Sequence, residues 1–323
     1  DENNLFREDL EYEIGQITLE ELRAIIKELK RRTAAGPDEI PMEAFKEMDD
    51  ESLQKIVDLL NEWWENENIP EEILEARVVL IFKKGDTSDL SNYRPIALLN
   101  SIYKIIASII EKRLSETLDP KLQKTQYGFR KKKSTSQAIH IIRRIIDMGE
   151  RSDKELYLIL LDWEKTFDQV KQEKLFEALE RMGVAPKLIN MIKQLYKNPK
   201  YKVEMEGYTS DWYKQHTGIR QGCPLSPYLF LVIMTVMFHD IHNDTQHQKD
   251  MGVDRILGAV FDEVLYADDT IIQSTDAKKV EKLLHRIEQE GEKYGLKLNK
   301  NKCETMNVRG ISEVHFEDGN KVK

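Results

Sequence analysis

Two adjacent aspartates, Asp268 and Asp269, lie between short apolar segments rich in β-forming residues, 264–267 and 270–272. This pattern predicts a β-hairpin with the aspartates at or beside its turn, although tight hairpin turns favour Asn-Gly, Asp-Gly or Gly-X. Two carboxylates about 4 Å apart repel each other by about 4 kcal/mol at an effective dielectric constant of about 20. A hard divalent cation such as Mg²⁺ would offset this repulsion. For an isolated pair, a solvated Asp-Asp turn would be the simpler interpretation.

A third aspartate upstream favours the metal-binding interpretation. Residues 156–161 are apolar and predict a buried strand, and Asp162 follows directly at its end. If this strand neighbours the hairpin, Asp162 comes close to Asp268 and Asp269. Three carboxylates without histidine or cysteine suit a phosphoryl-transfer site with two metal ions better than a zinc site.

The composition limits which classes of protein are possible. The chain has 323 residues, of which 40% are hydrophobic and 33% charged, and this is typical of a globular protein with a sizeable core. No apolar run approaches the roughly 18 residues that a membrane span needs, and no secretory signal opens the sequence. The two cysteines, Cys223 and Cys303, exclude a disulfide framework or a zinc knuckle. Because the chain starts at Asp1, we expect a fragment or a trimmed product.

Positive charge is concentrated in one segment, although the net charge is −9. Residues 121–146 contain eight lysines and arginines and no acidic residue. Such a segment can contact phosphates and release their counterions. A solvated basic loop or a nuclear localisation signal is the alternative. Together with the carboxylates, the segment favours nucleic-acid binding.

Three motifs resemble those of the reverse transcriptase domain of non-LTR retrotransposons, the LINE-type RNA-directed DNA polymerases. Residues 266–269 match the Tyr/Phe-x-Asp-Asp box, and residues 161–170 match the first catalytic box. Residues 218–227, Gly-Ile-Arg-Gln-Gly-Cys-Pro-Leu-Ser-Pro, match the template and nucleotide box and are the most specific of the three. The resemblance extends from about Ile17 to the C-terminus.

The resemblance implies the catalytic roles. Asp162, Asp268 and Asp269 would bind two Mg²⁺ ions, for which Mn²⁺ can substitute. One ion would help to activate a primer 3′-hydroxyl, and the other would hold the triphosphate and the leaving pyrophosphate. In the next family box a lysine can protonate the pyrophosphate, and Lys302 matches this position better than Lys300.

Three basic residues resemble the family's fingers hairpin. The resemblance implies that Lys83, Lys84 and Arg94 grip the triphosphate of the incoming nucleotide, because lysine offers a point charge and arginine a fork for phosphate oxygens. The alternative is a charged surface turn, and the sequence does not distinguish Lys83 from Lys84.

Further residues are assigned to the nucleotide pocket. Phe167 matches an aromatic residue beneath the sugar that excludes a ribose 2′-hydroxyl, although it could also be a core side chain. Gln221 and Gly222 are expected to line the pocket, glycine allowing a close backbone approach. Asp168 matches a family acid that does not bind metal, and we expect it to be structural.

The basic segment contains a further family box. Residues 126–130, Gln-Tyr-Gly-Phe-Arg, and Ser134-Thr135 resemble the family's Gln-x-Gly-Phe and Arg-Ser-Thr motifs, with Lys133 where arginine is usual. A bidentate phosphate contact would therefore become monodentate. The candidate nucleic-acid-binding residues are Arg130, Lys131, Lys132 and Lys133.

The resemblance implies an α+β fold of the right-hand polymerase type, with helical fingers, an antiparallel-sheet palm and no thumb. We expect residues 1–62 to form an N-terminal helical extension and residues 63–323 to form fingers and palm, ending before the primer grip and thumb. Apolar spacing predicts a helix at about 98–115. Residues that typically start or end helices predict two more, at about 226–240 and 276–295.

The predicted function is that of a reverse transcriptase within a retroelement protein, which extends a DNA or RNA primer with dNTPs on an RNA template. The alternatives are an inactive remnant that only binds nucleic acid, and another templated polymerase, either intron-encoded or a viral RNA-dependent RNA polymerase. We expect no membrane association and an intracellular location, in the nucleus or the cytoplasm. The sequence leaves the oligomeric state open.

Overall fold

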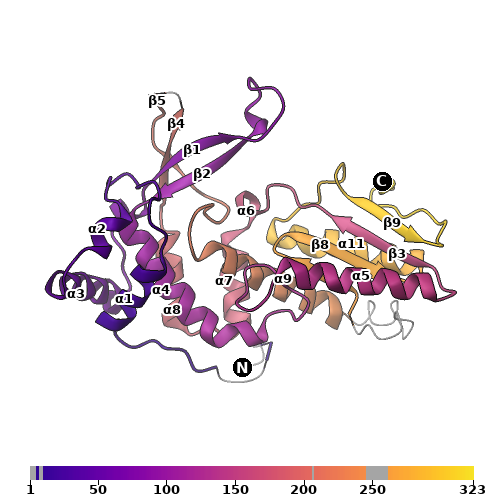
Figure 1. The fold of residues 1–323 in the computed structure, drawn as a ribbon, viewed down its shortest axis with the longest axis horizontal. Helices are drawn as coiled ribbons and strands as arrows, with labels where there is room; N and C mark the ends of the chain where they lie inside the picture. Colours follow the sequence, from indigo (N-terminus) through magenta and orange to yellow (C-terminus); the bar gives the residue numbers. More distant parts are fainter. Residues whose placement is uncertain (1–4, 7–9, 206, 245–260) are drawn as a thin grey trace. The chain divides into compact units, whose positions relative to one another are not determined.

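A computed structural model describes residues 5–6, 10–205, 207–244 and 261–323. The chain, drawn in Figure 1, separates into two compact units. The first comprises Asp1–Leu118 and Leu179–Tyr228, and the second comprises Asp119–Ala178 and Leu229–Lys323.

The first unit is organised around helix α4 (Ser101–Leu118), whose isoleucines at positions 102, 105, 106, 109 and 110 are all buried. Helices α1 (Leu19–Glu28) and α8 (Pro186–Leu195) pack against α4, and α1 also contacts α2 (Met42–Lys46) and α3 (Asp50–Asn66). The N-cap of α1 is the side chain of Thr18, which accepts a hydrogen bond from the Glu21 amide.

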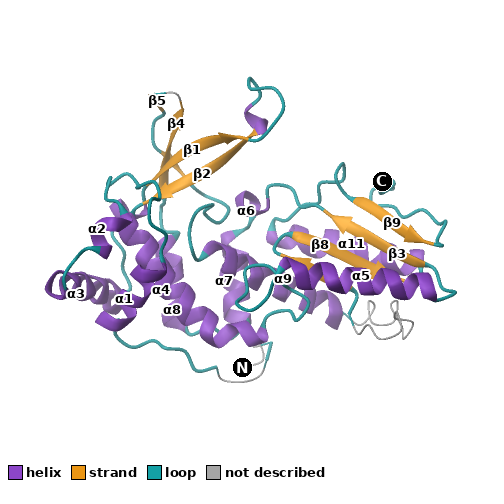
Figure 2. Cartoon of the chain, in the orientation of Figure 1, coloured by secondary structure: helices purple, strands orange, loops and turns teal. Residues whose placement is uncertain are grey.

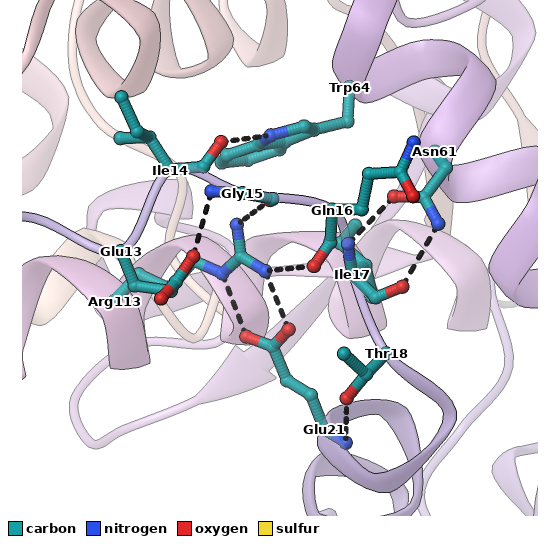
Figure 3. A network of polar contacts seen from close by, with 10 residues as sticks. All are labelled: Glu13, Ile14, Gly15, Gln16, Ile17, Thr18, Glu21, Asn61, Trp64 and Arg113. Carbon is teal, nitrogen blue, oxygen red and sulfur yellow. Dashed lines mark hydrogen bonds and ion pairs between the residues drawn. The ribbon is translucent and has the colours of Figure 1, made fainter.

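A buried arginine contacts several of these segments at once (Figure 3). Arg113 of α4 is 2% exposed, and its guanidinium binds both carboxylate oxygens of Glu21 on α1, at 2.6 and 2.8 Å. It also donates to the carbonyls of Gly15 and Gln16 and lies 4.7 Å from the centre of the Trp64 ring on α3. One side chain of α4 therefore holds the N-terminal segment, α1 and α3.

The sheet of the first unit combines strands from distant parts of the chain (Figure 2). The antiparallel hairpin of β1 (Ala76–Phe82) and β2 (Tyr93–Leu99) is joined by β4 (Lys200–Met205), which runs parallel to β1. The short strands β5 (Tyr208–Thr209) and β6 (Tyr213–Lys214) both pair with β4. The described part of the first unit also contains two short 3₁₀ helices, η1 (Glu71–Leu74) and η2 (Leu90–Asn92). A third, η3 (Asp119–Lys121), belongs to the second unit.

The second unit is built on a fully antiparallel sheet with the strand order β7-β8-β3-β9. Helix α5 packs on this sheet through Ala138 and Ile145, which contact Leu156, Leu158 and Val264, while α11 contacts β8 (Figure 1). Bounds in this unit are α5 (Thr135–Arg151), β3 (Leu156–Leu161), α6 (Thr166–Gln169), β7 (Glu263–Tyr266), β8 (Asp269–Ser274), α11 (Ala277–Tyr294) and β9 (Glu304–Val308). Helices α7 (Gln172–Arg181) and α9 (Ser226–Asn243) each contain residues of both units.

The predicted α+β class with an antiparallel sheet is confirmed, and so are the helices expected at 98–115, 226–240 and 276–295, within a few residues. The predicted boundary between residues 62 and 63 falls inside α3, and it stays a prediction. Among the helices of the described ranges, none combines the length and the apolar character that crossing a bilayer requires.

Candidate active site

The hairpin that carries Asp268 and Asp269 consists of β7 and β8. Tyr266 pairs with Asp269, which leaves Ala267 and Asp268 as the two residues of the turn. Ala267 has a φ of 58°, in the left-handed region that L-residues rarely adopt. The buried Thr270 hydroxyl donates to the Asp268 carbonyl at 3.3 Å, and it accepts a hydrogen bond from the Trp163 indole at 3.2 Å.

Strand β3 brings Asp162 to the same end of the sheet. Leu161 pairs with Thr270, so Asp162 follows at the position next to Asp269. The backbone of Asp162 is held by the Asn299 amide, which donates to its carbonyl at 2.8 Å. Partial burial, then the charge of Asp268 and then that of Asp162, raises the pKa of Asp269 above its usual value. The Asp269 carboxylate therefore lies within electrostatic reach of both Asp268 and Asp162.

A lysine side chain forms an ion pair with one of these aspartates. The Nζ of Lys302 lies 3.6 Å from Oδ2 of Asp162, and the Lys302 side chain is 65% exposed. Lys300, the weaker candidate, is instead paired with Glu288 at 3.0 Å and with Asp318 at 2.7 Å. The geometry thus places Lys302, not Lys300, beside Asp162.

Among the described residues, no three Asp, Glu, His or Cys side chains form a ready-made metal cage. The three aspartates nonetheless supply only hard oxygen donors, the ligands that Mg²⁺ prefers and that suit zinc less well. The donor chemistry fits a hard divalent cation, which would also relieve the repulsion that raises the pKa of Asp269.

The raised pKa of Asp269 leads to a stability prediction. Because the pKa is higher in the folded than in the unfolded state, the ionised carboxylate costs stability as the pH rises through the folded-state value. We expect Asp269→Asn to raise the urea midpoint at pH 7 in metal-free buffer. This gain should shrink as the pH falls toward the usual aspartate pKa of about 3.9. Identical midpoints for the variant and the wild type at pH 7 would contradict the prediction.

Phe167 lies at the start of α6, five residues after Asp162. Its ring is partly exposed and stacks on Phe230 of α9, with centroids 5.6 Å apart and an interplanar angle of 26°. Phe230 itself is fully buried. The geometry is compatible with both expectations for Phe167, a packed core ring and a ring with one accessible face.

In the first unit, the candidate phosphate-binding residues lie on the β1–β2 hairpin. Arg94 is exposed and pairs with Ile81, and the Lys83 amide extends the ladder by donating to the Asn92 carbonyl at 2.8 Å. Because side chains alternate along a strand, Lys83 shares the face of Arg94, whereas Lys84 lies in the bend beyond the strand. The pairing therefore favours Lys83 over Lys84 as the partner of Arg94.

Gln221 and Gly222 lie against strand β2 within the first unit. The Ala97 amide donates to the Gln221 carbonyl at 3.1 Å. Gly222 has a φ of +110°, and a Cβ added there would come within 2.6 Å of the Ala97 carbonyl oxygen. The preceding residue, Arg220, is buried and donates to the Leu74 carbonyl. Glycine is therefore required at position 222 by the protein's own backbone.

We expect Gly222→Ala to lower the free energy of unfolding by about 2–3 kcal/mol, because it adds a clash to an unfavourable φ. Gly207→Ala is the matched control, since Gly207 also has a positive φ, of +85°, but open space around a Cβ. The control should cost about 1–2 kcal/mol. Equal losses in urea unfolding would show that the approach to Ala97 does not matter.

The basic segment divides into buried and exposed members. The side chain of Arg130 is only 7% exposed, because its guanidinium binds the Asp119 carboxylate and the carbonyls of Asp119 and Gln123. Lys133 donates to the Lys124 carbonyl and lies 4.4 Å from the Tyr127 ring centre. Lys131 and Lys132 are exposed.

An open cavity of about 460 Å³ lies beside this segment. Its lining residues are Tyr127, Lys132, Lys133, Ser136, Gln137, His140 and Ile141.

Sequence reasoning assigned no role to Gln126, which contacts the catalytic turn. The Gln126 side chain is 1% exposed, and its amide forms hydrogen bonds with both the N–H and the C=O of Ala267. Its place in the Gln-x-Gly-Phe motif was the one signal in the sequence. The contact spans 141 positions, so no local pattern could predict it.

Comparison with known proteins adds to this geometry. The family described as "Reverse transcriptase (RNA-dependent DNA polymerase)" matches residues 81–316, more than half of the chain. Similar proteins include the Pol polyprotein of the type-1 retrotransposable element R2 from Nasonia vitripennis, 29% identical over 87% of this chain and 26% of that protein. Another is the RNA-directed DNA polymerase from the mobile element jockey of Drosophila melanogaster, 27% identical over 90% of this chain and 31% of that protein.

The chain therefore spans less than a third of the length of these curated relatives. Among solved structures, telomerase from Candida tropicalis in complex with a fragment of telomeric RNA has a similar fold. The TM-score is 0.55 with 15% sequence identity, over 81% of this chain and 45% of that chain. At this identity the likeness concerns the fold alone.

Proposed function

This chain belongs to the reverse transcriptase (RNA-dependent DNA polymerase) family, and from this premise we propose that it is the polymerase part of a non-LTR retroelement protein. The relative from the mobile element jockey carries the name RNA-directed DNA polymerase. The proposed reaction is the extension of a DNA or RNA primer with dNTPs on an RNA template. The observation that carries the proposal is the meeting of Asp162 with the Asp268-Asp269 hairpin at one end of an antiparallel sheet.

We assign Asp162, Asp268 and Asp269 to the binding of two Mg²⁺ ions, or of Mn²⁺ in their place. When bound, such ions lower the pKa of a hydroxyl nucleophile and neutralise charge on phosphate oxygens. The chain's own contribution is to hold three carboxylates at fixed positions on paired strand ends. We assign to Lys302, whose Nζ lies 3.6 Å from Asp162, the supply of a proton to the leaving pyrophosphate.

For the incoming dNTP, we assign phosphate contacts to Arg94 and Lys83, which share one face of the β1–β2 hairpin. Lys84 remains a weaker candidate. Phe167 is proposed to lie beneath the sugar and to disfavour a 2′-hydroxyl, and Gln221 and Gly222 to line the nucleotide pocket.

For the template, we assign backbone contacts to Lys131, Lys132 and Lys133, which lie in the segment that is free of acidic residues. The Candida tropicalis telomerase was solved with an RNA fragment, and we infer an RNA template for this chain. Arg130 contributes indirectly, because its guanidinium binds Asp119 and so orders the segment that carries the lysines.

Primer extension tests the proposal. The chain is incubated with an RNA template, an annealed DNA primer, Mg²⁺ and either dNTPs or rNTPs. We expect elongation with dNTPs, and we expect Phe167→Ala to increase the use of rNTPs. Elongation by the wild type with rNTPs in preference to dNTPs would point to an RNA polymerase instead.

The absence of a ready-made metal cage among the described residues favours one alternative, a nucleic-acid-binding protein without catalysis. In that case the chain would bind the primer–template with a salt-dependent affinity but would not elongate the primer at any Mg²⁺ or Mn²⁺ concentration. Elongation that depends on a divalent cation would exclude this alternative.

A further inference from the structure

The turn between β7 and β8 contains an unfavourable backbone conformation. Ala267 has a φ of 58°, and it is the first of the two turn residues. Two-residue hairpin turns that need a positive φ at this position strongly favour glycine, asparagine or aspartate. An alanine there persists only if its surroundings stabilise the conformation.

The surroundings of Ala267 include the side-chain amide of Gln126. Its Oε1 accepts hydrogen bonds from the amides of Ala267 at 2.9 Å and of Gly128 at 2.8 Å. Its Nε2 donates to the Ala267 carbonyl at 3.1 Å. One buried amide therefore binds the N–H and the C=O of the residue with the unfavourable φ, as a neighbouring strand would.

The segment that carries Gln126 is itself fixed to β7. The Tyr127 amide donates to the Leu265 carbonyl at 2.8 Å, and the Leu265 amide donates to the Thr125 carbonyl at 3.0 Å. A Cβ added to Gly128 would come within 2.1 Å of the Ala267 nitrogen, so only glycine permits this approach. The Gln126 amide is thus held in place before any ligand arrives.

We propose that Gln126 is a positioning residue, which holds Ala267 in the left-handed conformation and thereby directs Asp268 and Asp269 toward Asp162. Without the amide, repulsion among the three carboxylates and the unfavourable φ would both favour a relaxed turn. The consequence for catalysis depends on the proposed polymerase function, whereas the consequence for the turn does not.

The proposal is tested with Gln126→Met, which preserves the length of the side chain and removes its hydrogen bonds. Amide hydrogen exchange of the metal-free protein reports the turn, and single-turnover primer extension reports the catalytic effect. We expect exchange of the Ala267 amide to accelerate at least about 10-fold. We also expect the extension rate to fall about 10- to 100-fold, with the dNTP concentration for half-maximal rate changed less than about 3-fold.

Two further variants separate positioning from general destabilisation. Gln273→Met removes another buried glutamine, which donates to the Phe261 carbonyl from the far part of β8, and it should leave the exchange of Ala267 unchanged. Ala267→Gly lets the turn adopt a positive φ without strain. In the Ala267→Gly background, Gln126→Met should lower the extension rate by less than about 3-fold.

The outcomes are distinguishable. Unchanged exchange of Ala267 in Gln126→Met, or equal acceleration in Gln273→Met, would overturn the proposal. The same holds if Ala267→Gly fails to diminish the effect of Gln126→Met on the extension rate. If the wild type does not extend primers while the exchange results are as expected, the polymerase function fails and the positioning role stands.

Discussion

Replacing Asp268 with asparagine is expected to reduce primer extension at least about 1,000-fold and to leave the urea midpoint of unfolding unchanged or slightly higher. Asparagine has nearly the shape of aspartate but lacks the negative charge that binds a divalent cation. Removal of a single group that stabilises charge in a transition state costs about 10²- to 10³-fold, and a metal ligand also affects ground-state assembly of the site. Asp162→Asn should show a loss of the same size.

Asp153→Asn is the matched control, because Asp153 lies just before the other end of β3, is fully exposed and pairs with Arg309 at 3.1 Å. Its extension rate should stay within about 2-fold of the wild-type rate. We expect Asp269→Asn to be damaging but milder than Asp268→Asn. Extension by Asp162→Asn or Asp268→Asn at the wild-type rate would refute the assignment of the carboxylates.

Replacing Arg113 with methionine is expected to lower the free energy of unfolding of the first unit by about 3–5 kcal/mol. The substitution leaves the carboxylate of Glu21, which is only 16% exposed, without its bidentate partner. It also removes the donors to the Gly15 and Gln16 carbonyls (Figure 3). Urea unfolding measures the loss.

Arg31→Met is the control for this prediction. Arg31 also pairs with a glutamate, Glu47, but both side chains are more than 60% exposed, and such pairs contribute about 0–1 kcal/mol. Combining Arg113→Met with Glu21→Leu should recover part of the loss, because no buried charge is then left unpaired. A loss below about 1 kcal/mol for Arg113→Met would contradict a buried anchoring role.

The parts of the site that follow from local patterns could be predicted from the sequence. An apolar run that ends at Asp162 predicts a strand with an acid at its end, and two β-prone segments around Asp268 predict a hairpin. The resemblance to the family motifs then predicts that this strand and this hairpin belong to one site. The structure agrees with the predicted hairpin: Ala267 and Asp268 are the turn residues, and Asp269 is the first residue of β8.

Contacts between distant segments could not be predicted in this way. The parallel pairing of β1 with β4 joins residues more than 100 positions apart and leaves no periodic signal in either strand. The same is true of the Gln126 amide on Ala267. The burial of Arg130 could not be predicted either. A basic run in a sequence does not reveal that one of its arginines binds Asp119 and is buried.

Paramagnetic relaxation with Mn²⁺ tests whether Asp162, Asp268 and Asp269 bind a divalent cation together. Substoichiometric Mn²⁺ should broaden the amide signals around these three residues first, Mg²⁺ should compete, and Asp162→Asn should abolish the selective broadening. Broadening that is equally strong in Asp162→Asn, or that occurs first elsewhere in the protein, would contradict the claim.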